Sequence, residues 1–224
     1  QDTYSSLDGP LVDAQEGDII THVNGQRISG PTTLASQLRG TANSPVRLKL
    51  RRGLSSHETM VTPMAQSTST RLRYDDWEEQ RRLTVEAEGE QDIGYIHLRA
   101  MGGDNYEEWM QGYFPNVNRR GLIIDVRHNR GGNIDSWLLE KLMRTRWFYW
   151  QGHAGGPSPS MPHAFAGHIV VLVDAHTASD GEAFAEGVRR LGLGTIIGTR
   201  TWGGEIWLSY SNWLVDKGIA SAAE

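Results

Sequence analysis

Hydrophobic and polar residues alternate in two rhythms along this chain, and the first rhythm is that of β-strands. Residues 46–50 read Val-Arg-Leu-Lys-Leu, so apolar and charged side chains alternate as in a strand with one exposed face. The run at 18–23 is rich in β-branched residues and is followed by Asn24-Gly25, a strong signal for a tight turn. We therefore expect residues 1–64 to form a small β-rich module.

A helical rhythm follows and then alternates with strand-like runs. We expect a polar, Ser/Thr-rich linker at 65–70 and a charged amphipathic helix at 71–88, so that 65–92 connects two domains. Strand-like and helix-like runs then alternate at 93–98, 106–113, 122–126, 134–143, 169–173, 181–191 and 195–198. This alternation predicts an α/β domain over 93–224 with a mostly parallel sheet, in which active sites gather at the carboxyl ends of strands.

A serine follows the most apolar of these strand-like runs. The segment Thr177-Ala178-Ser179-Asp180-Gly181-Glu182 lies between the run at 169–173 and the expected helix at 181–191. A strand-to-helix corner exposes a serine hydroxyl beside unpaired N–H groups of the first helical turn, as acyl transfer requires. The alternative is a capping box formed by Ser179 and Glu182, and the two interpretations are compatible.

A paired-glycine turn follows another buried strand. The run at 122–126 leads into Arg-His-Asn-Arg at 127–130 and then Gly131-Gly132. Adjacent glycines let the backbone approach a ligand and turn its N–H groups outward. Two alternatives are a turn that only needs positive φ and a phosphate-binding loop, but the chain lacks Gly-x-Gly-x-x-Gly and a Walker lysine.

The amino-acid composition excludes several kinds of partner and of catalytic chemistry. The 224 residues are 38% hydrophobic and 22% charged with a net charge of −5, which argues against nucleic acid as a partner. The absence of cysteine excludes thiol catalysis, cysteine-ligated metals and disulfides. The eight histidines show no zinc-site spacing, and no apolar run has the length of a membrane helix. We expect no cofactor, no metal and no membrane insertion.

The two motifs together resemble a known family. Asp-x-Arg-x-Asn-x-Gly-Gly at 125–132, followed by Thr-Ala-Ser-Asp-Gly-Glu at 177–182, is similar to the tail-specific and tricorn serine peptidase family. The block at 16–26, with Gly-Asp-Ile-Ile leading to Val-Asn-Gly, resembles a PDZ domain, a module that docks peptides. The resemblance implies ClpP/crotonase-like layering for the α/β domain, a PDZ-like module before it, and peptides or unfolded polypeptide as substrates.

The resemblance also implies roles for individual residues. Ser179 would be the nucleophile, the backbone N–H groups of Gly132 and Asp180 would form the oxyanion hole, and Gly131 would contact substrate. The family's processing branch uses a lysine base whose place here is taken by Gly204, which favours the tricorn-like branch with a serine, a histidine and an acidic partner. The histidine is expected before this chain begins, and the acidic partner after Glu224.

Several alternatives stay open at this stage. His176 and His128 lie near the motifs, but loop roles are favoured for both. The aromatic residues at 147–150 suit either the core beside a flexible connector or one wall of a peptide groove. The alternative function is a non-catalytic peptide-binding protein that uses the PDZ-like module and the groove. We expect a cytoplasmic location, and a homo-oligomer is a further expectation.

Overall fold

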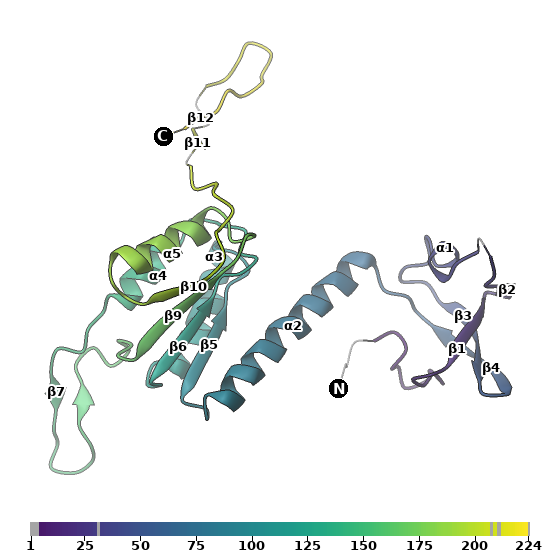
Figure 1. The fold of residues 1–224 in the computed structure, drawn as a ribbon, viewed down its shortest axis with the longest axis horizontal. Helices are drawn as coiled ribbons and strands as arrows, with labels where there is room; N and C mark the ends of the chain where they lie inside the picture. Colours follow the sequence, from purple (N-terminus) through teal and green to yellow (C-terminus); the bar gives the residue numbers. More distant parts are fainter. Residues whose placement is uncertain (1–4, 31, 207, 210–211, 224) are drawn as a thin grey trace. The chain divides into compact units, whose positions relative to one another are not determined.

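The computed structural model describes residues 5–30, 32–206, 208–209 and 212–223. The chain divides into two compact units, Gln1–Trp77 and Glu78–Glu224, which Figure 1 shows in the colours of the sequence. The expected class is confirmed, because an antiparallel β-rich unit precedes an α/β unit with a parallel sheet.

The first unit contains a four-stranded antiparallel sheet with strand order β2-β1-β3-β4. The alternation at 46–50 places Val46, Leu48 and Leu50 in its core, together with Val23 and Val61. Asn24 and Gly25 both have positive φ, as the tight turn between β1 and β2 requires. Its elements are β1 (Ile19–Val23), β2 (Gln26–Arg27), the one-turn helix α1 (Leu34–Gln37), β3 (Val46–Arg52) and β4 (Ser55–Val61).

The segment expected to be a linker is part of a long helix. Helix α2 spans Gln66–Glu88, so the expectation of a linker at 65–70 was wrong. No glycine or proline follows Pro63 until Gly89, and serine and threonine lower helix propensity only slightly. Nothing in the sequence therefore stops the helix from beginning at Gln66.

The second unit is built on a parallel sheet with strand order β10-β9-β6-β5. Each new strand along the chain is added on the same side of the strand before it. Right-handed crossovers therefore place the connecting helices on one face of the sheet. The burial pattern agrees: Leu122 and Ile124 of β6 are buried, whereas Ile123 between them is half-buried. The elements are β5 (Ile93–His97), α3 (Gly103–Asn116), β6 (Gly121–Asp125), α4 (Asp135–Leu142), β9 (His168–Val173), α5 (Asp180–Arg190) and β10 (Thr195–Gly198).

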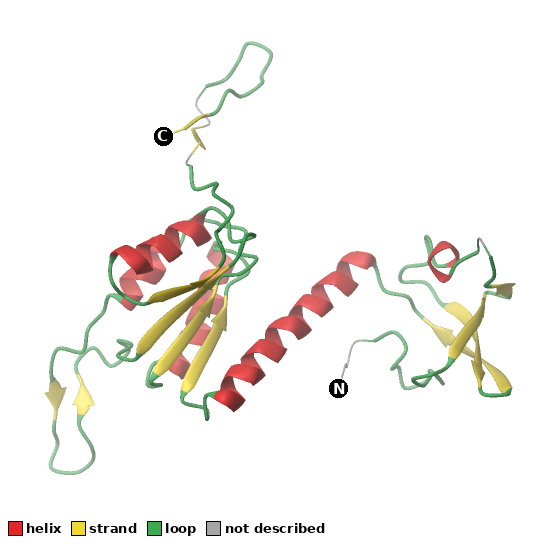
Figure 2. Cartoon of the chain, in the orientation of Figure 1, coloured by secondary structure: helices red, strands yellow, loops and turns green. Residues whose placement is uncertain are grey.

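Two small hairpins complete the second unit, as Figure 2 shows. The first pairs β7 (Tyr149–Trp150) with β8 (Ser158–Pro159), and the second pairs β11 (Leu208–Ser209) with β12 (Ala222–Ala223). Because α4 returns the chain to the amino ends of the strands, the β7–β8 hairpin lies at that end of the sheet (Figure 1). No helix in the described part of the chain is long and apolar enough to cross a membrane.

The core of the second unit yields a stability prediction. Ile124 is fully buried in the central strand β6, so Ile124→Ala should lower the free energy of unfolding by about 3 kcal/mol through lost burial and a residual cavity. Urea unfolding followed by tryptophan fluorescence measures this, because every tryptophan except Trp77 lies in the second unit. The fully exposed Val215→Ala is the control, and an equal loss in both variants would contradict the packing described here.

Candidate functional site

Ser179 occupies a strained corner between β9 and α5. Its backbone has φ 51° and ψ −126°, a conformation that non-glycine residues rarely adopt. It is the N-cap residue of α5, yet its side chain makes no capping hydrogen bond, and the residue is only half-buried. The corner therefore does not use the hydroxyl to complete the helix.

Glu182 supplies the capping interaction that the hydroxyl does not. Its Oε2 accepts the Ser179 N–H at 2.9 Å, which is one half of the expected capping box. The same carboxylate accepts the N–H groups of Gly203 (2.6 Å) and Gly204 (3.0 Å). Burial alone would raise the pKa of Glu182, but the Thr201 side chain and these amides lower it overall. Glu182 is thus an ionised centre that joins the serine corner to the loop at 201–204.

The glycine turn lies directly beside the serine. Gly131 has φ 81°, and a Cβ added to it would lie 2.5 Å from the Ser179 Cβ and 3.0 Å from its Oγ. Only a residue without a side chain fits this approach. A Cβ on Gly132 would overlap the backbone carbonyl of Met101. Both glycines are therefore required by close contact, and Gly131 also by its backbone conformation.

The turn leaves one amide facing outward. The Met101 N–H donates to the Gly131 carbonyl and the Asn133 N–H donates to the Met101 carbonyl, both at 2.8 Å. In this parallel pairing the N–H of Gly132 points to the other side, and the residue is exposed. Within the described residues neither the N–H of Gly132 nor that of Asp180 has an acceptor. These two free donors belong to the segments that meet at Ser179.

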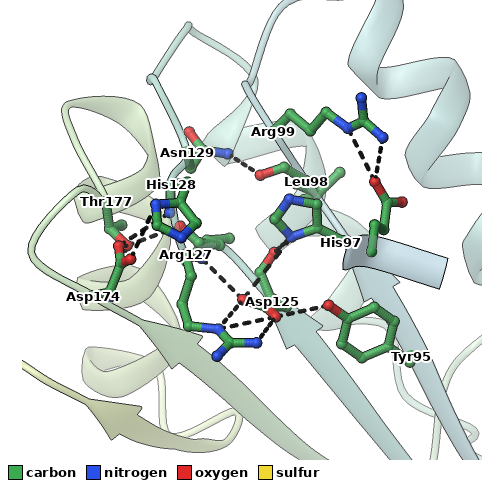
Figure 3. Close-up of polar contacts among 12 residues, drawn as sticks. Tyr95, His97, Leu98, Arg99, Asp125, Arg127, His128, Asn129, Asp174 and Thr177 are labelled. Atoms are coloured by element: carbon green, nitrogen blue, oxygen red, sulfur yellow. Dashed lines mark hydrogen bonds and ion pairs between the residues drawn. The ribbon is translucent and has the colours of Figure 1, made fainter. Parts of the chain in front are cut away.

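Asn129 joins three segments of the site; it belongs to the motif at 125–132, but no role was predicted for it from the sequence. Its fully buried side chain donates to the Leu98 carbonyl at 2.7 Å and accepts the Gly131 N–H at 2.8 Å (Figure 3 shows the first bond). Its own carbonyl accepts the Ala178 N–H at 2.9 Å. The available signal was an Asn two residues before a glycine, a spacing typical of side chains that bond to the backbone of their own turn.

The side chain of Asp180 joins the starts of two helices. Its Oδ2 accepts the N–H groups of Ile134 (2.7 Å) and Asp135 (3.0 Å), where α4 begins. The residue is fully buried, and its Oδ1 has no partner among the described residues. Burial raises the pKa of Asp180 to about 6; the Ile134 amide opposes this shift and the charge of Asp135 adds to it.

A second polar network supports the end of β6, as Figure 3 shows. The buried Asp125 carboxylate accepts the Tyr95 hydroxyl at 2.7 Å and the Arg127 side chain at 2.6 and 2.9 Å. The His97 ring lies 2.8 Å from the Asp125 carbonyl, and burial lowers the pKa of His97. Burial and the Asp125 charge raise the pKa of Tyr95. The network fixes the strand from which the glycine turn departs.

The two nearby histidines interact with each other and with Asp174. The His176 and His128 rings are stacked with centroids 5.2 Å apart, and the His128 Nδ1 lies 3.3 Å from the Asp174 carboxylate (Figure 3 shows this pair). Burial would raise the pKa of Asp174, but the amides of His128 and His176 lower it overall. No hydrogen bond between described residues joins His176 to Ser179. The loop role favoured for both histidines agrees with this arrangement.

The aromatic segment at 147–150 does not lie at this site. It leads into the β7–β8 hairpin at the amino ends of the strands, whereas Ser179 follows the carboxyl end of β9. The interpretation of this segment as a wall of the groove beside Ser179 is therefore wrong. No group of three or more metal-ligating side chains occurs in the part of the chain that the structure describes.

A serine on a strained strand-to-helix corner of an α/β sheet, beside free backbone amides, is an arrangement typical of serine hydrolases. The chain belongs to peptidase family S41, whose family model, described as "Peptidase family S41", matches residues 92–224. A second model, "Tricorn protease PDZ domain", matches residues 1–66.

Individual relatives agree with this assignment. The chain is 32% identical over 213 residues to "Tricorn protease" of Thermoplasma volcanium, covering 95% of this chain and 21% of that protein. It is 34% identical over 218 residues to "Tricorn protease homolog 1" of Streptomyces coelicolor, covering 96% and 20%. The solved structure "Crystal structure of the tricorn protease" is similar with a TM-score of 0.71 and 30% identity, covering 92% and 20%. The chain thus spans about a fifth of the length of these relatives.

The close contact at Gly132 yields a second prediction. Gly132→Ala should lower the free energy of unfolding by about 2 kcal/mol, because the added methyl group must displace the Met101 carbonyl or the turn. Gly103→Ala is the matched control, since a Cβ there meets nothing within 4 Å. Urea unfolding compares the two variants. Equal stability of both would show that the turn has more room than the structure gives it.

The buried carboxyl of Asp180 yields a pH prediction. Because burial raises its pKa from 3.8 to about 6, the folded state binds the proton more tightly than the unfolded state. The resulting stabilisation is fully present below about pH 4 and is lost as the pH rises through about 6. Asp180→Asn keeps an oxygen that accepts the two α4 amides but does not titrate. The free energy of unfolding of the wild type minus that of the variant should therefore fall between about pH 4 and 7; a flat difference would contradict this.

Proposed function

We propose that this chain carries the nucleophile and the oxyanion-binding groups of a serine peptidase of tricorn type, acting on peptides or unfolded polypeptide. The observation that carries the proposal is the pair of free N–H groups, of Gly132 and Asp180, on the two segments that meet at the unbonded Ser179 hydroxyl. The membership in peptidase family S41 supports it.

The proposed reaction follows from this geometry. The Ser179 Oγ attacks the carbonyl carbon of the scissile peptide bond while a general base takes the hydroxyl proton. The carbonyl oxygen becomes an oxyanion that the Gly132 and Asp180 N–H groups bind, with Gly131 leaving room for the substrate backbone. The C–N bond then breaks, the leaving amine receives the proton, and water hydrolyses the acyl-serine. Each oxyanion donor typically contributes on the order of 3 kcal/mol to transition-state stabilisation.

We infer that the general base and its acidic partner come from residues outside this chain. No described histidine or lysine is hydrogen-bonded to the Ser179 hydroxyl, and the tricorn relatives are about five times as long as the segment they share with this chain. The expectations of a cytoplasmic location and of a homo-oligomer stay predictions.

The nucleophile is tested by Ser179→Ala in the full-length protein that contains this chain. Peptide turnover should fall by a factor on the order of 10⁴ or more, because the variant lacks the hydroxyl that forms the proposed acyl intermediate. A fluorophosphonate probe should label the wild type and not the variant. Ser136→Ala, which changes an exposed serine on α4, is the control and should keep both turnover and labelling.

The outcomes of these experiments distinguish a peptidase from a non-catalytic peptide-binding protein. Turnover retained by Ser179→Ala would remove Ser179 as the nucleophile. A folded wild type that binds peptides but is neither labelled nor hydrolytic would favour the alternative, a non-catalytic peptide-binding protein.

A further inference from the structure

Trp202 is an exposed aromatic residue whose loop is hydrogen-bonded to the serine corner. The residue follows β10 at the carboxyl ends of the strands, the same end at which Ser179 follows β9. Its side chain is 67% exposed, although tryptophan is usually buried to a large extent. An exposed indole at this end of the sheet therefore needs an explanation other than core packing.

The loop that carries Trp202 is hydrogen-bonded to the serine corner at three consecutive residues. The Trp202 N–H donates to the Thr177 carbonyl at 3.0 Å. The next two N–H groups, of Gly203 and Gly204, donate to Glu182, which also accepts the Ser179 N–H. The backbone at 202–204 is thus held against the same short segment, 177–182, that presents the Ser179 hydroxyl.

The orientation of the indole is set by the loop itself. A side chain at Gly204 would overlap the six-membered ring of Trp202, so the ring lies against the Gly204 backbone. Gly203 has φ 85°, which allows the tight bend between them. The indole is therefore held in place by its own loop, while two-thirds of its surface remains available to a ligand. Such a rigid ring offers a large apolar contact at low entropic cost.

We propose that Trp202 is a specificity-determining residue that packs against an apolar side chain of the peptide close to the bond attacked by Ser179. The proposal rests on the proposed function, because it places the peptide across Ser179 and the amides of Gly132 and Asp180. Glu182 is a positioning residue that holds the Trp202 loop against that site. The substrates favoured are those with leucine or phenylalanine at the contacted position over those with alanine.

The test measures peptide binding apart from chemistry, in the full-length protein with Ser179→Ala. The probes are dye-labelled peptides of one host sequence in which a central position is Leu, Phe or Ala, with Kd measured by fluorescence anisotropy. Adding Trp202→Ala should raise Kd about tenfold for the Leu and Phe peptides and less than about twofold for the Ala peptide. Trp202→Phe keeps a ring and should give an intermediate loss.

The matched control is Trp147→Ala, which removes a tryptophan of nearly equal exposure, 68%, from the opposite end of the sheet. It should change no Kd. Equal loss for all three peptides, no preference for Leu or Phe over Ala before Trp202 is changed, or the same effect in Trp147→Ala would overturn the proposal. Failure of the proposed function appears separately, as a wild type that no fluorophosphonate labels while the Trp202-dependent preference persists.

Discussion

The hydrogen bonds between the glycine turn and the serine corner are the constraint on which the site depends. Asn129 receives the Ala178 N–H on its carbonyl, and Asp180 receives the Ile134 N–H on its carboxylate. Both residues are fully buried, and a buried polar group left without its partner costs about 1–3 kcal/mol. Separating the two segments would leave groups on both sides unpaired at once. The positions of the Ser179 hydroxyl and of the Gly132 and Asp180 amides are therefore fixed by hydrogen bonds of neighbouring groups within the protein, and not by a substrate.

This constraint explains how a strained serine is tolerated. A strained backbone conformation of this kind typically costs about 1–3 kcal/mol and persists only where the surrounding structure holds it in place. At Ser179 the surroundings are the Glu182 carboxylate, which takes its N–H, and the neighbouring Ala178 N–H bond to Asn129. The capping and nucleophile interpretations of Ser179 and Glu182 then describe one arrangement. Glu182 and the backbone complete the start of helix α5. The Ser179 hydroxyl therefore has no structural role there.

The sequence predicted those parts of the molecule that short-range patterns determine. Alternating apolar runs predict the parallel sheet, and a serine or paired glycine after such a run predicts where the site lies. The hydrogen bond from the Gly203 N–H to the Glu182 carboxylate was not predictable, because it joins residues far apart in sequence with no spacing rule between them. The sequence left the place of the segment at 147–150 open between core and groove wall, because its location depends on the direction of α4 and not on its own residues. The expectation of a linker at 65–70 was wrong because a Ser/Thr-rich composition is a weaker signal for a loop than a glycine or a proline.

The loop at 201–204 also bears on how the base is supplied. In the processing branch of the family, as distinct from the tricorn-like branch that the sequence resembles, the lysine base would stand at Gly204. Here the Gly204 N–H donates to Glu182, and any side chain at this position would overlap the Trp202 ring. A lysine at 204 would therefore require Trp202 to leave its place. The loop at 201–204 therefore cannot present a lysine base to Ser179 and at the same time keep the Trp202 indole against its own backbone. At position 204 the geometry of this loop thus favours contact between the Trp202 ring and the backbone over a side chain that could act as a base.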